Sequence, residues 1–295
     1  MALWLLLSAG LAADSGRAKV AVAPAESLHV VRVGAGAPVI LVPGFFGSTL
    51  GFGKLVPLLS AAGYQSIIVE PLGTGFSSRP PHADYSLSAQ ADRIAAVLDS
   101  LHIRDAPVIA HSVGGAIALR LAYRRPDLVL ALVSLEGGPT ERVATPEFRR
   151  AARFVPWIKI FGGIGLIRHQ IRRTLIASSG DTSWVTDGIV YGFTAGAAAD
   201  LNGTLKAFVA MANSREPVRL EPHLHEIECP VRLELGGAPH DGGVDSSEVT
   251  ELRRSLGTFS VDSIPGVGHY VQEERPEAIV AALAKAQASA RAAQR

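Results

Sequence analysis

The chain has 295 residues, of which 48% are hydrophobic and 19% charged, with 28 basic against 27 acidic side chains. This near-balance of charge excludes a strongly basic nucleic-acid-binding protein, and the hydrophobic content excludes an intrinsically disordered chain. The single cysteine excludes an internal disulfide framework and a zinc site built on several thiolates. We therefore expect a folded α/β protein with a large hydrophobic core.

The N-terminal segment, residues 1–19, begins with 13 residues that carry no charged side chain. An apolar run over 3–7 precedes several small residues, a pattern typical of a secretory signal peptide, although the positive charge at its start is missing. The run is shorter than the ~20 apolar residues of a membrane-spanning helix. Two alternatives stay open: a cleaved signal, giving a secreted or periplasmic protein, or an uncleaved segment on a cytoplasmic one.

Short apolar stretches predict the strands of the fold. Fully apolar strands that alternate with helices are typical of a mostly parallel sheet covered on both faces. The predicted strands are Val20–Ala23, Ser27–Val33, Pro38–Val42, Ile67–Glu70, Pro107–Ala110, Val129–Leu135, Val231–Leu235 and Phe259–Ile264. Helical spacing of apolar residues predicts helices over 88–100, 114–123 and 276–295.

The alternation of predicted strands and helices is interrupted between residues 140 and 221. No apolar strand is recognisable there, and this connection is far longer than an ordinary one. We predict a helical cap over 140–221, inserted into a core made of residues 20–139 and 222–295. Its helix-like stretches are 146–160, 164–177, 183–196 and 200–213.

The segment Ala110-His111-Ser112-Val113-Gly114 lies between a predicted strand and an Ala-rich predicted helix. This strand–turn–helix context is that of a nucleophile elbow, whose tight turn needs small residues such as Ala110 and Gly114. We therefore predict Ser112 as a nucleophile. The alternative is a serine that only caps the helix N-terminus.

A serine nucleophile needs a general base, and the base needs an acid that orients it. His269 follows the last predicted strand in a glycine-containing loop and is the predicted base. Among the acids that lie between Ser112 and His269 in the chain, three are candidates for this role. Asp241, in the loop after the strand 231–235, is favoured, and Glu136 and Asp245 remain alternatives.

The oxyanion of the reaction needs backbone donors. We expect them to be the N–H groups of Val113, after the nucleophile, and of Phe45, after Gly44. The side chain of His111 is expected on the opposite side of the elbow from Ser112. Four residues are predicted to line the substrate pocket: Phe46, His111, Trp157 and Tyr270.

We expect no metal and no cofactor. His223 and His225 could share one face of a strand, with Cys229 and His240 further along the chain. No third ligand follows the standard spacing of a zinc site, so we do not predict one.

The first part of the predicted cap is strongly basic. Between Arg142 and Arg173 there are eight basic residues and a single acidic one, Glu147, which gives this segment a charge of +7. Apolar residues such as Trp157 are interleaved. The cap could bury its apolar face on the core, or its basic surface could contact anionic lipid or attract an anionic substrate. A nucleic-acid partner is not expected.

Three further segments carry a family resemblance. The segments Pro43-Gly44-Phe45-Phe46-Gly47-Ser48, Leu72-Gly73-Thr74-Gly75-Phe76-Ser77 and Pro265-Gly266-Val267-Gly268-His269 are similar to the oxyanion loop, a glycine-rich segment and the histidine loop of the α/β-hydrolase superfamily. With the elbow, they make the chain resemble an esterase- or lipase-like serine hydrolase with a helical cap. The resemblance implies an α/β-hydrolase fold with a catalytic triad.

The sequence departs from the family pattern in two places that matter for the site. Pro43 stands where the family usually has histidine. In the loop after the strand 231–235, the family's spacing between a glycine and the catalytic acid, counted from Gly237, leads to His240. Asp241 aligns with the family's acid only if the loop contains one extra residue.

The type of nucleophile narrows the reaction. Relatives that resemble epoxide hydrolases carry aspartate at the elbow, whereas this chain carries Ser112, which implies acyl transfer. We expect a hydrolase of small apolar carboxylic esters that works through an acyl-Ser112 intermediate. Hydrolysis of a carbon–carbon bond, a lactone or an amide stays open, as does a non-catalytic small-molecule receptor.

Overall fold

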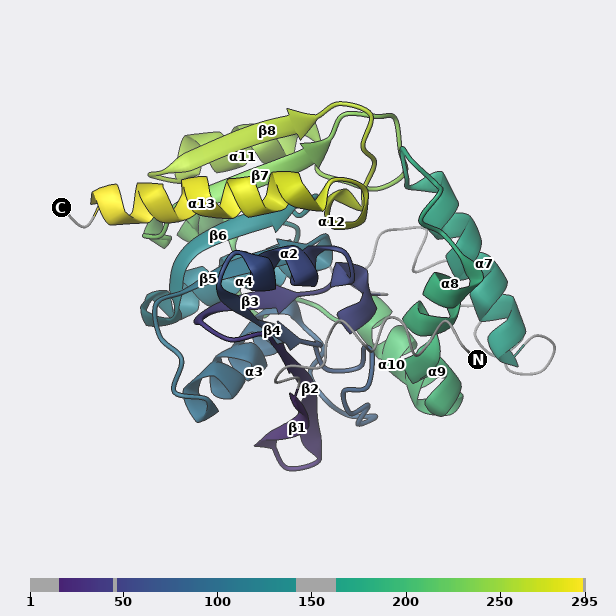
Figure 1. Ribbon diagram of the computed structural model, residues 1–295. Coiled ribbons are helices and arrows are strands. Elements are labelled where there is room, and N and C mark those ends of the chain that lie inside the picture. Colours follow the sequence, from purple (N-terminus) through teal and green to yellow (C-terminus); the bar gives the residue numbers. More distant parts are fainter. Residues whose placement is uncertain (1–15, 45–46, 142–162, 294–295) are drawn as a thin grey trace.

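The computed structural model describes residues 16–44, 47–141 and 163–293. Eight strands form one sheet in the order β1-β2-β4-β3-β5-β6-β7-β8 (Figure 1). The strands are β1 Gly16–Ala23, β2 Glu26–Val33, β3 Ala37–Val42, β4 Tyr64–Val69, β5 Ala106–His111, β6 Val129–Leu135, β7 Val231–Gly236 and β8 Phe259–Ile264.

Strands β3 to β8 are parallel, and β1 and β2 continue the sheet antiparallel at one edge. The two faces of the sheet are packed against different layers. Ile40 and Val42 join a core cluster with helices α3 (Leu87–Ser100) and α4 (Val113–Arg124). Val39 and Leu41 join a second cluster with α2 (Leu55–Ala61) and α13 (Pro276–Ala293). Burial on both faces explains why the central strands are apolar throughout.

The eight predicted strands are confirmed, with boundaries that shift by a few residues. The largest difference is at β1, which begins at Gly16 rather than Val20 and pairs Gly16 with Arg32. Residues 16–19 therefore belong to the sheet and not to the N-terminal segment. They were missed because this edge strand is largely exposed and carries no apolar pattern. Residues 1–13, with the predicted signal sequence, lie outside the described residues.

Between β6 and β7 the described part of the chain contains helices and no strand. They are α7 Gly163–Ala177, α8 Asp187–Phe193, α9 Ala195–Ala199, α10 Leu201–Asn213 and the short 3-10 helix η3 Glu221–Glu226. The predicted helices at 164–177 and 200–213 are confirmed. The predicted helix at 183–196 is wrong in its start and length, because Thr186 caps α8 and a break at Thr194 separates α8 from α9. The one at 146–160 lies outside the described residues.

Figure 1 shows α7 to α10 together at one end of the sheet. Two of the basic residues of α7 form contacts with side chains of α8. Arg172 forms an ion pair with Asp187, and the guanidinium of Arg168 lies 4.1 Å from the ring centre of Tyr191.

A buried arginine on α4 connects the two ends of the inserted segment. Arg120, 1% exposed, lies 2.7 Å from Glu141 and 3.2 Å from Glu216. It also donates to the carbonyl of Thr140, while the Glu141 carboxylate accepts a hydrogen bond from the N–H of Leu220. We call Arg120, Glu141 and Glu216 the Arg120 ion-pair cluster. It fixes the start and the end of the segment to the helix that follows Ser112.

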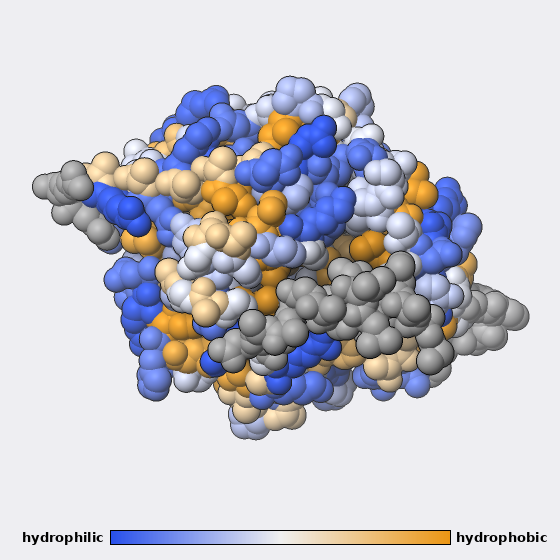
Figure 2. All heavy atoms as spheres, in the orientation of Figure 1, coloured by the Kyte–Doolittle hydropathy of each residue, from blue (hydrophilic) through white to orange (hydrophobic). Residues whose placement is uncertain are grey.

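Charged and apolar residues are interspersed over the face of the molecule that Figure 2 shows. Across the residues that the structure describes, no helix combines the length and the apolar character needed to cross a membrane.

Candidate active site

Ser112 lies between the last residue of β5 and the first residue of α4, with φ 55° and ψ −126°. A non-glycine residue rarely adopts this strained conformation, which is found where function requires it. Backbone hydrogen bonds hold it: Ser112 N–H donates to Leu135 O, and Ser112 O accepts from Gly115 N–H, both at 2.8 Å. The Ser112 side chain makes no capping hydrogen bond with α4, so the helix-cap alternative is wrong.

The turn around Ser112 is so tight that its glycines cannot be replaced without movement. A Cβ atom at Gly114 would lie 2.6 Å from the carbonyl oxygen of Val42. A Cβ atom at Gly137 would overlap the carbonyl oxygen of Ser112. Close packing of these backbones is what lets β5 turn sharply into α4 and expose Ser112.

His269 is fixed in its loop by backbone contacts. Its N–H donates to Ser178 O at 2.7 Å, and Gly268 N–H donates to the buried carboxylate of Glu274 at 3.1 Å. A Cβ atom at Gly268 would lie 2.5 Å from Ser178 O, so only glycine fits this close approach. These contacts hold the backbone of the His269 loop against the segment that follows α7.

His111 lies beside His269, contrary to the expectation that it points to the opposite side of the elbow. The His111 Nε2 atom is 2.9 Å from the carbonyl oxygen of His269, and the two ring centres are 4.8 Å apart. The sharp turn at Ser112 directs this side chain from the end of β5 toward the histidine loop. Burial lowers the pKa of His111 to about 4, so the ring stays neutral at neutral pH.

Among the described residues, the acid nearest to the ring nitrogens of His269 is Glu136, which follows β6 at a positive φ of 52°. Its Oε2 atom lies 4.0 Å from His269 Nδ1, and its Oε1 atom accepts a hydrogen bond from Gly236 N–H. This separation is longer than a hydrogen bond, as is common in catalytic groups without substrate. The structure therefore brings Glu136 and His269 together.

Asp241, which the sequence favours as the acid beside His269, does not lie in that position in the structure. Asp241 is exposed, and among the described residues no hydrogen bond or ion pair connects it to His269. Asp245 caps α11 (Ser246–Ser255) through a capping box with Glu248. The physical reason lies in the loop after β7, where Gly242 and Gly243 adopt positive φ and the side chain that turns inward is that of His240.

His240 is a site residue that sequence reasoning missed. Its Nε2 atom lies 3.6 Å from Glu136 Oε2, and its Nδ1 atom lies 2.7 Å from the carbonyl oxygen of Ala238. The signal was present in the sequence, because the family's usual spacing from Gly237 leads to His240.

Burial shifts the pKa values of Glu136 and His269. Burial raises the pKa of Glu136, against the opposing effect of the hydrogen bond from Gly236 N–H. Burial holds the pKa of His269 well below its usual range. The His269 ring is therefore neutral at neutral pH, which is the state a general base needs.

Gly44, in the loop after β3, lies against the elbow. A Cβ atom at Gly44 would lie 3.1 Å from Ser112 Cβ. Val113, whose N–H is a predicted oxyanion donor, is the first residue of α4, where backbone N–H groups have no partner within the helix. Gly44 and Val113 also line a small recess of about 10 Å³, room for one water molecule. Phe45, Phe46 and Trp157 lie outside the described residues.

A buried carboxylate fixes the end of this loop. Glu70, fully buried after β4, accepts hydrogen bonds from Thr49 N–H at 2.8 Å and from Phe76 N–H at 2.7 Å. It also lies 2.9 Å from His29 Nδ1. Burial alone would raise the pKa of Glu70, but these hydrogen bonds lower it, so the group is an anion that ties three segments together.

Tyr270 connects His269 to the inserted helices. Its ring centre lies 5.4 Å from that of His269 and 5.2 Å from that of Trp184. Tyr270, Trp184, Val190 of α8 and Leu175 of α7 belong to one buried cluster. The predicted pocket residue Tyr270 is therefore placed next to the candidate base, where it is itself buried.

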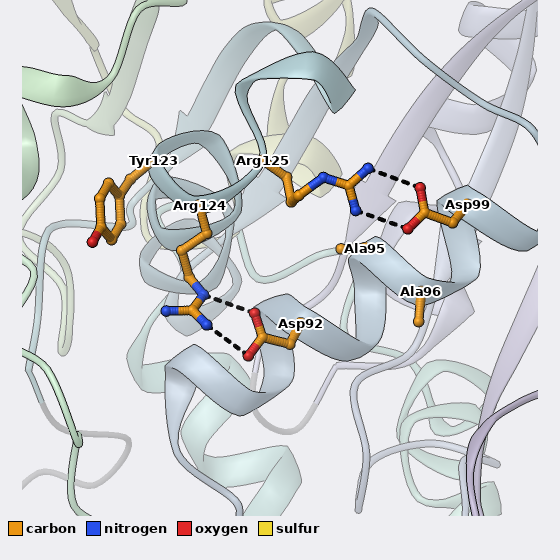
Figure 3. Close-up of a pocket in the computed structure, with 7 residues that line it drawn as sticks. All are labelled: Asp92, Ala95, Ala96, Asp99, Tyr123, Arg124 and Arg125. Atoms are coloured by element: carbon orange, nitrogen blue, oxygen red, sulfur yellow. Dashed lines mark hydrogen bonds and ion pairs between the residues drawn. The ribbon is translucent and has the colours of Figure 1, made fainter.

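One groove in the described part of the chain is remote from these residues. It has a volume of about 500 Å³ and lies between α3 and the end of α4 (Figure 3). Figure 3 shows its arginines paired, Arg124 with Asp92 and Arg125 with Asp99. Ser112 precedes the opposite end of α4, about 18 Å away for a helix of this length.

Comparisons with known proteins agree with this architecture. A family model described as alpha/beta hydrolase fold matches residues 37–157. Eight strands in a mostly parallel sheet, with Ser112 at a strained turn between β5 and α4, complete the pattern. The chain belongs to the α/β-hydrolase superfamily. The predicted fold and family are thus confirmed.

Several relatives of this α/β hydrolase are hydrolases. The uncharacterized hydrolase YugF of Bacillus subtilis (strain 168) is 26% identical over 81% of this chain and 86% of its own length. An sn-1-specific diacylglycerol lipase of Mus musculus is 24% identical over 81% of this chain and 77% of its own. Bifunctional epoxide hydrolase 2 of Sus scrofa is 33% identical over 39% of this chain, but the match spans only 21% of that protein.

Solved structures show the same fold. An esterase from Thermogutta terrifontis has a TM-score of 0.72 at 20% identity and covers 94% of this chain and 99% of its own. The epoxide hydrolase CorEH has a TM-score of 0.76 at 18% identity, with coverage of 94% and 99%. This α/β hydrolase therefore shares its whole architecture with enzymes of different specificity, and its reaction has to be argued from its own residues.

Proposed function

We propose that this α/β hydrolase cleaves carboxylic esters of small apolar substrates, with Ser112 as nucleophile, His269 as general base and Glu136 as the acid. The observation that carries the proposal is the strained backbone of Ser112, which is stabilised at the turn between β5 and α4. Strain of this kind is maintained where a side chain must be presented for chemistry. Glu136 replaces Asp241 in the proposal because it is buried and faces His269.

In the proposed reaction, Ser112 Oγ attacks the carbonyl carbon of the ester and its proton moves to His269 Nε2. The negative charge on the carbonyl oxygen is stabilised by the N–H groups of Val113 and Phe45. His269 then gives the proton to the alcohol oxygen as the carbon–oxygen bond breaks, which leaves an acyl group on Ser112. Water, deprotonated by His269, attacks this acyl group. The bond between the acyl carbon and Ser112 Oγ then breaks as His269 returns the proton to Oγ, which releases the carboxylic acid.

Two further observations support acyl transfer. The relatives include a lipase, and the structural neighbours include an esterase. A bifunctional epoxide hydrolase also matches part of this chain. The family resemblance implies aspartate at the elbow of such enzymes, whereas this chain has Ser112. We also propose that residues 140–221 form a cap, whose buried cluster around Trp184 and Tyr270 limits access to His269.

The test is hydrolysis of p-nitrophenyl acetate, butyrate and octanoate by the full chain and by a Ser112→Ala variant. We expect the variant to lose at least about 10³-fold in kcat, since the nucleophile is absent. Retained far-ultraviolet circular dichroism shows that the variant is folded. Wild-type rates equal to those of Ser112→Ala on all three esters would refute ester hydrolysis, and lactone, amide and carbon–carbon substrates would then be compared in the same way.

A further inference from the structure

Two histidines of the site direct ring nitrogens at one buried carboxylate. Glu136 Oε2, His240 Nε2 and His269 Nδ1 all lie within 4.8 Å of one another. Oε2 is 3.6 Å from His240 Nε2 and 4.0 Å from His269 Nδ1. The side chains of His240, Glu136 and His269 are only 8%, 2% and 11% exposed, so water does not solvate this group freely.

Both ring nitrogens are buried without a hydrogen-bond partner in the described part of the chain. For His240 the second nitrogen explains why. With Nδ1 2.7 Å from Ala238 O, a neutral ring carries its proton on Nδ1 and directs the lone pair of Nε2 at the carboxylate. Two electron-rich atoms then face each other at 3.6 Å, an arrangement that a cation between them would stabilise.

The surrounding groups are those of a metal site. A histidine that binds a metal commonly donates its other N–H to a backbone carbonyl, as His240 does to Ala238, and a ligating carboxylate is itself hydrogen-bonded, as Glu136 is by Gly236 N–H. Space is left because Gly243 has no side chain: its Cβ atom would lie 2.5 Å from Glu136 Oε2 and 3.2 Å from His240 Nε2.

We propose that Glu136, His240 and His269 bind a zinc ion. Two imidazole nitrogens and one carboxylate oxygen are ligands that zinc prefers, with a fourth position left for water. Bonds of about 2.0–2.1 Å place neighbouring ligands of a tetrahedral ion about 3.3 Å apart, so small side-chain rotations close the observed separations. Mg²⁺, which prefers oxygen ligands, does not fit this donor set.

Occupancy of this zinc site would stop the reaction proposed above, and this consequence rests on the proposed function. Zinc on His269 Nδ1 leaves the single proton of the neutral ring on Nε2. Nε2 then has no lone pair to accept the proton of Ser112. Zinc binding and ester hydrolysis are therefore mutually exclusive, and the chain is inhibited reversibly by zinc.

The test measures zinc binding directly, by calorimetric titration of the metal-free full chain with ZnCl₂ and, separately, MgCl₂. We expect saturable 1:1 binding of zinc and no comparable binding of magnesium. His240→Gln is expected to weaken zinc binding at least tenfold. His223→Gln is the matched control, because His223 is a more exposed histidine that pairs with Glu226 and lies outside the cluster. Its zinc affinity is expected to equal that of the wild type.

Zinc affinity unchanged in His240→Gln, or absence of 1:1 binding by the wild type, would overturn the zinc site. If His240→Gln does not fold, a wild-type crystal soaked in ZnCl₂ decides by its anomalous peak: a peak among Glu136, His240 and His269 supports the site, and its absence refutes it. Hydrolysis is measured separately with and without zinc. Zinc bound at this site without inhibition would refute the incompatibility with His269, whereas inactivity on every ester would refute the proposed function and leave the binding result intact.

Discussion

At the scale of single residues, the site is decided by backbone conformation. Ser112 and Glu136 both adopt positive φ at the carboxyl ends of neighbouring parallel strands, β5 and β6. These turns direct one side chain of each strand end toward the histidine loop. The positions of Ser112 at the strand-to-helix turn and of His269 in the loop after β8 could be predicted because their sequence context is specific. The position of Glu136, rather than Asp241, next to His269 could not, because it depends on how the loop after β7 folds around Gly242 and Gly243.

The identity of the acid is testable by two neutral substitutions. We expect Glu136→Gln to lower kcat for p-nitrophenyl acetate by on the order of 10³–10⁴-fold, because the orientation of the His269 ring is lost. Asp241→Asn is the matched control and is expected to change kcat less than about threefold, since Asp241 is exposed and, within the described residues, forms no hydrogen bond or ion pair with His269. A larger loss in Asp241→Asn than in Glu136→Gln would restore Asp241 as the acid.

The pH dependence of the reaction follows from the burial of His269. Because burial lowers the pKa of His269 well below the ordinary histidine value of 6.5, the protonated ring becomes neutral below that pH. Only the unprotonated ring can act as a base, so activity should rise with pH and level off below pH 6.5. The pH dependence of kcat/KM measures this rise in activity. A midpoint above 6.5 would mean that His269 is not held in the buried state described here.

At the scale of secondary structure, the elements that could be predicted are those with a buried face. β6 is buried almost throughout and its boundaries, Val129–Leu135, were predicted correctly. The first four residues of β1 were missed because they are exposed, and their place in the sheet depends on pairing with β2. α8 and α9 were merged in the prediction because the break at Thr194 carries no proline or glycine signal of its own.

The packing of the helices inserted after β6 depends on the ring of Trp184. Trp184, 5% exposed, packs against Tyr270 and Phe193. We expect Trp184→Ala to lower the free energy of unfolding by about 3–5 kcal/mol through loss of buried area and a remaining cavity. Urea denaturation measures this. Tyr191→Ala, at a position that is 52% exposed, should cost less than about 1 kcal/mol. Equal effects would show that Trp184 does not carry the packing of these helices.

At the scale of the whole molecule, the Arg120 ion-pair cluster joins the sheet domain to the inserted segment. Replacing Arg120 with methionine leaves the carboxylate of Glu216, 4% exposed, buried without its cation. We expect Arg120→Met to destabilise the protein by about 3–5 kcal/mol in urea denaturation.

Arg124→Met provides the control for this substitution on the same helix. Arg124 pairs with Asp92 at the surface (Figure 3), and both side chains are at least one-third exposed. Such exposed pairs contribute about 0–1 kcal/mol. Destabilisation by Arg120→Met no greater than that by Arg124→Met would mean that the cluster does not hold the inserted segment.

The Arg120 ion-pair cluster has a consequence for how the chain can change in length. Because Glu141 and Glu216 meet at one guanidinium, the ends of the segment between them stay close whatever that segment contains. The entropic free-energy cost of closing a flexible loop grows only logarithmically with its length, by about 0.6 kcal/mol for each doubling. The sheet with Ser112, Glu136 and His269 can therefore accept a longer, shorter or unrelated covering segment as an exchangeable part, provided that the two glutamates and Arg120 are retained.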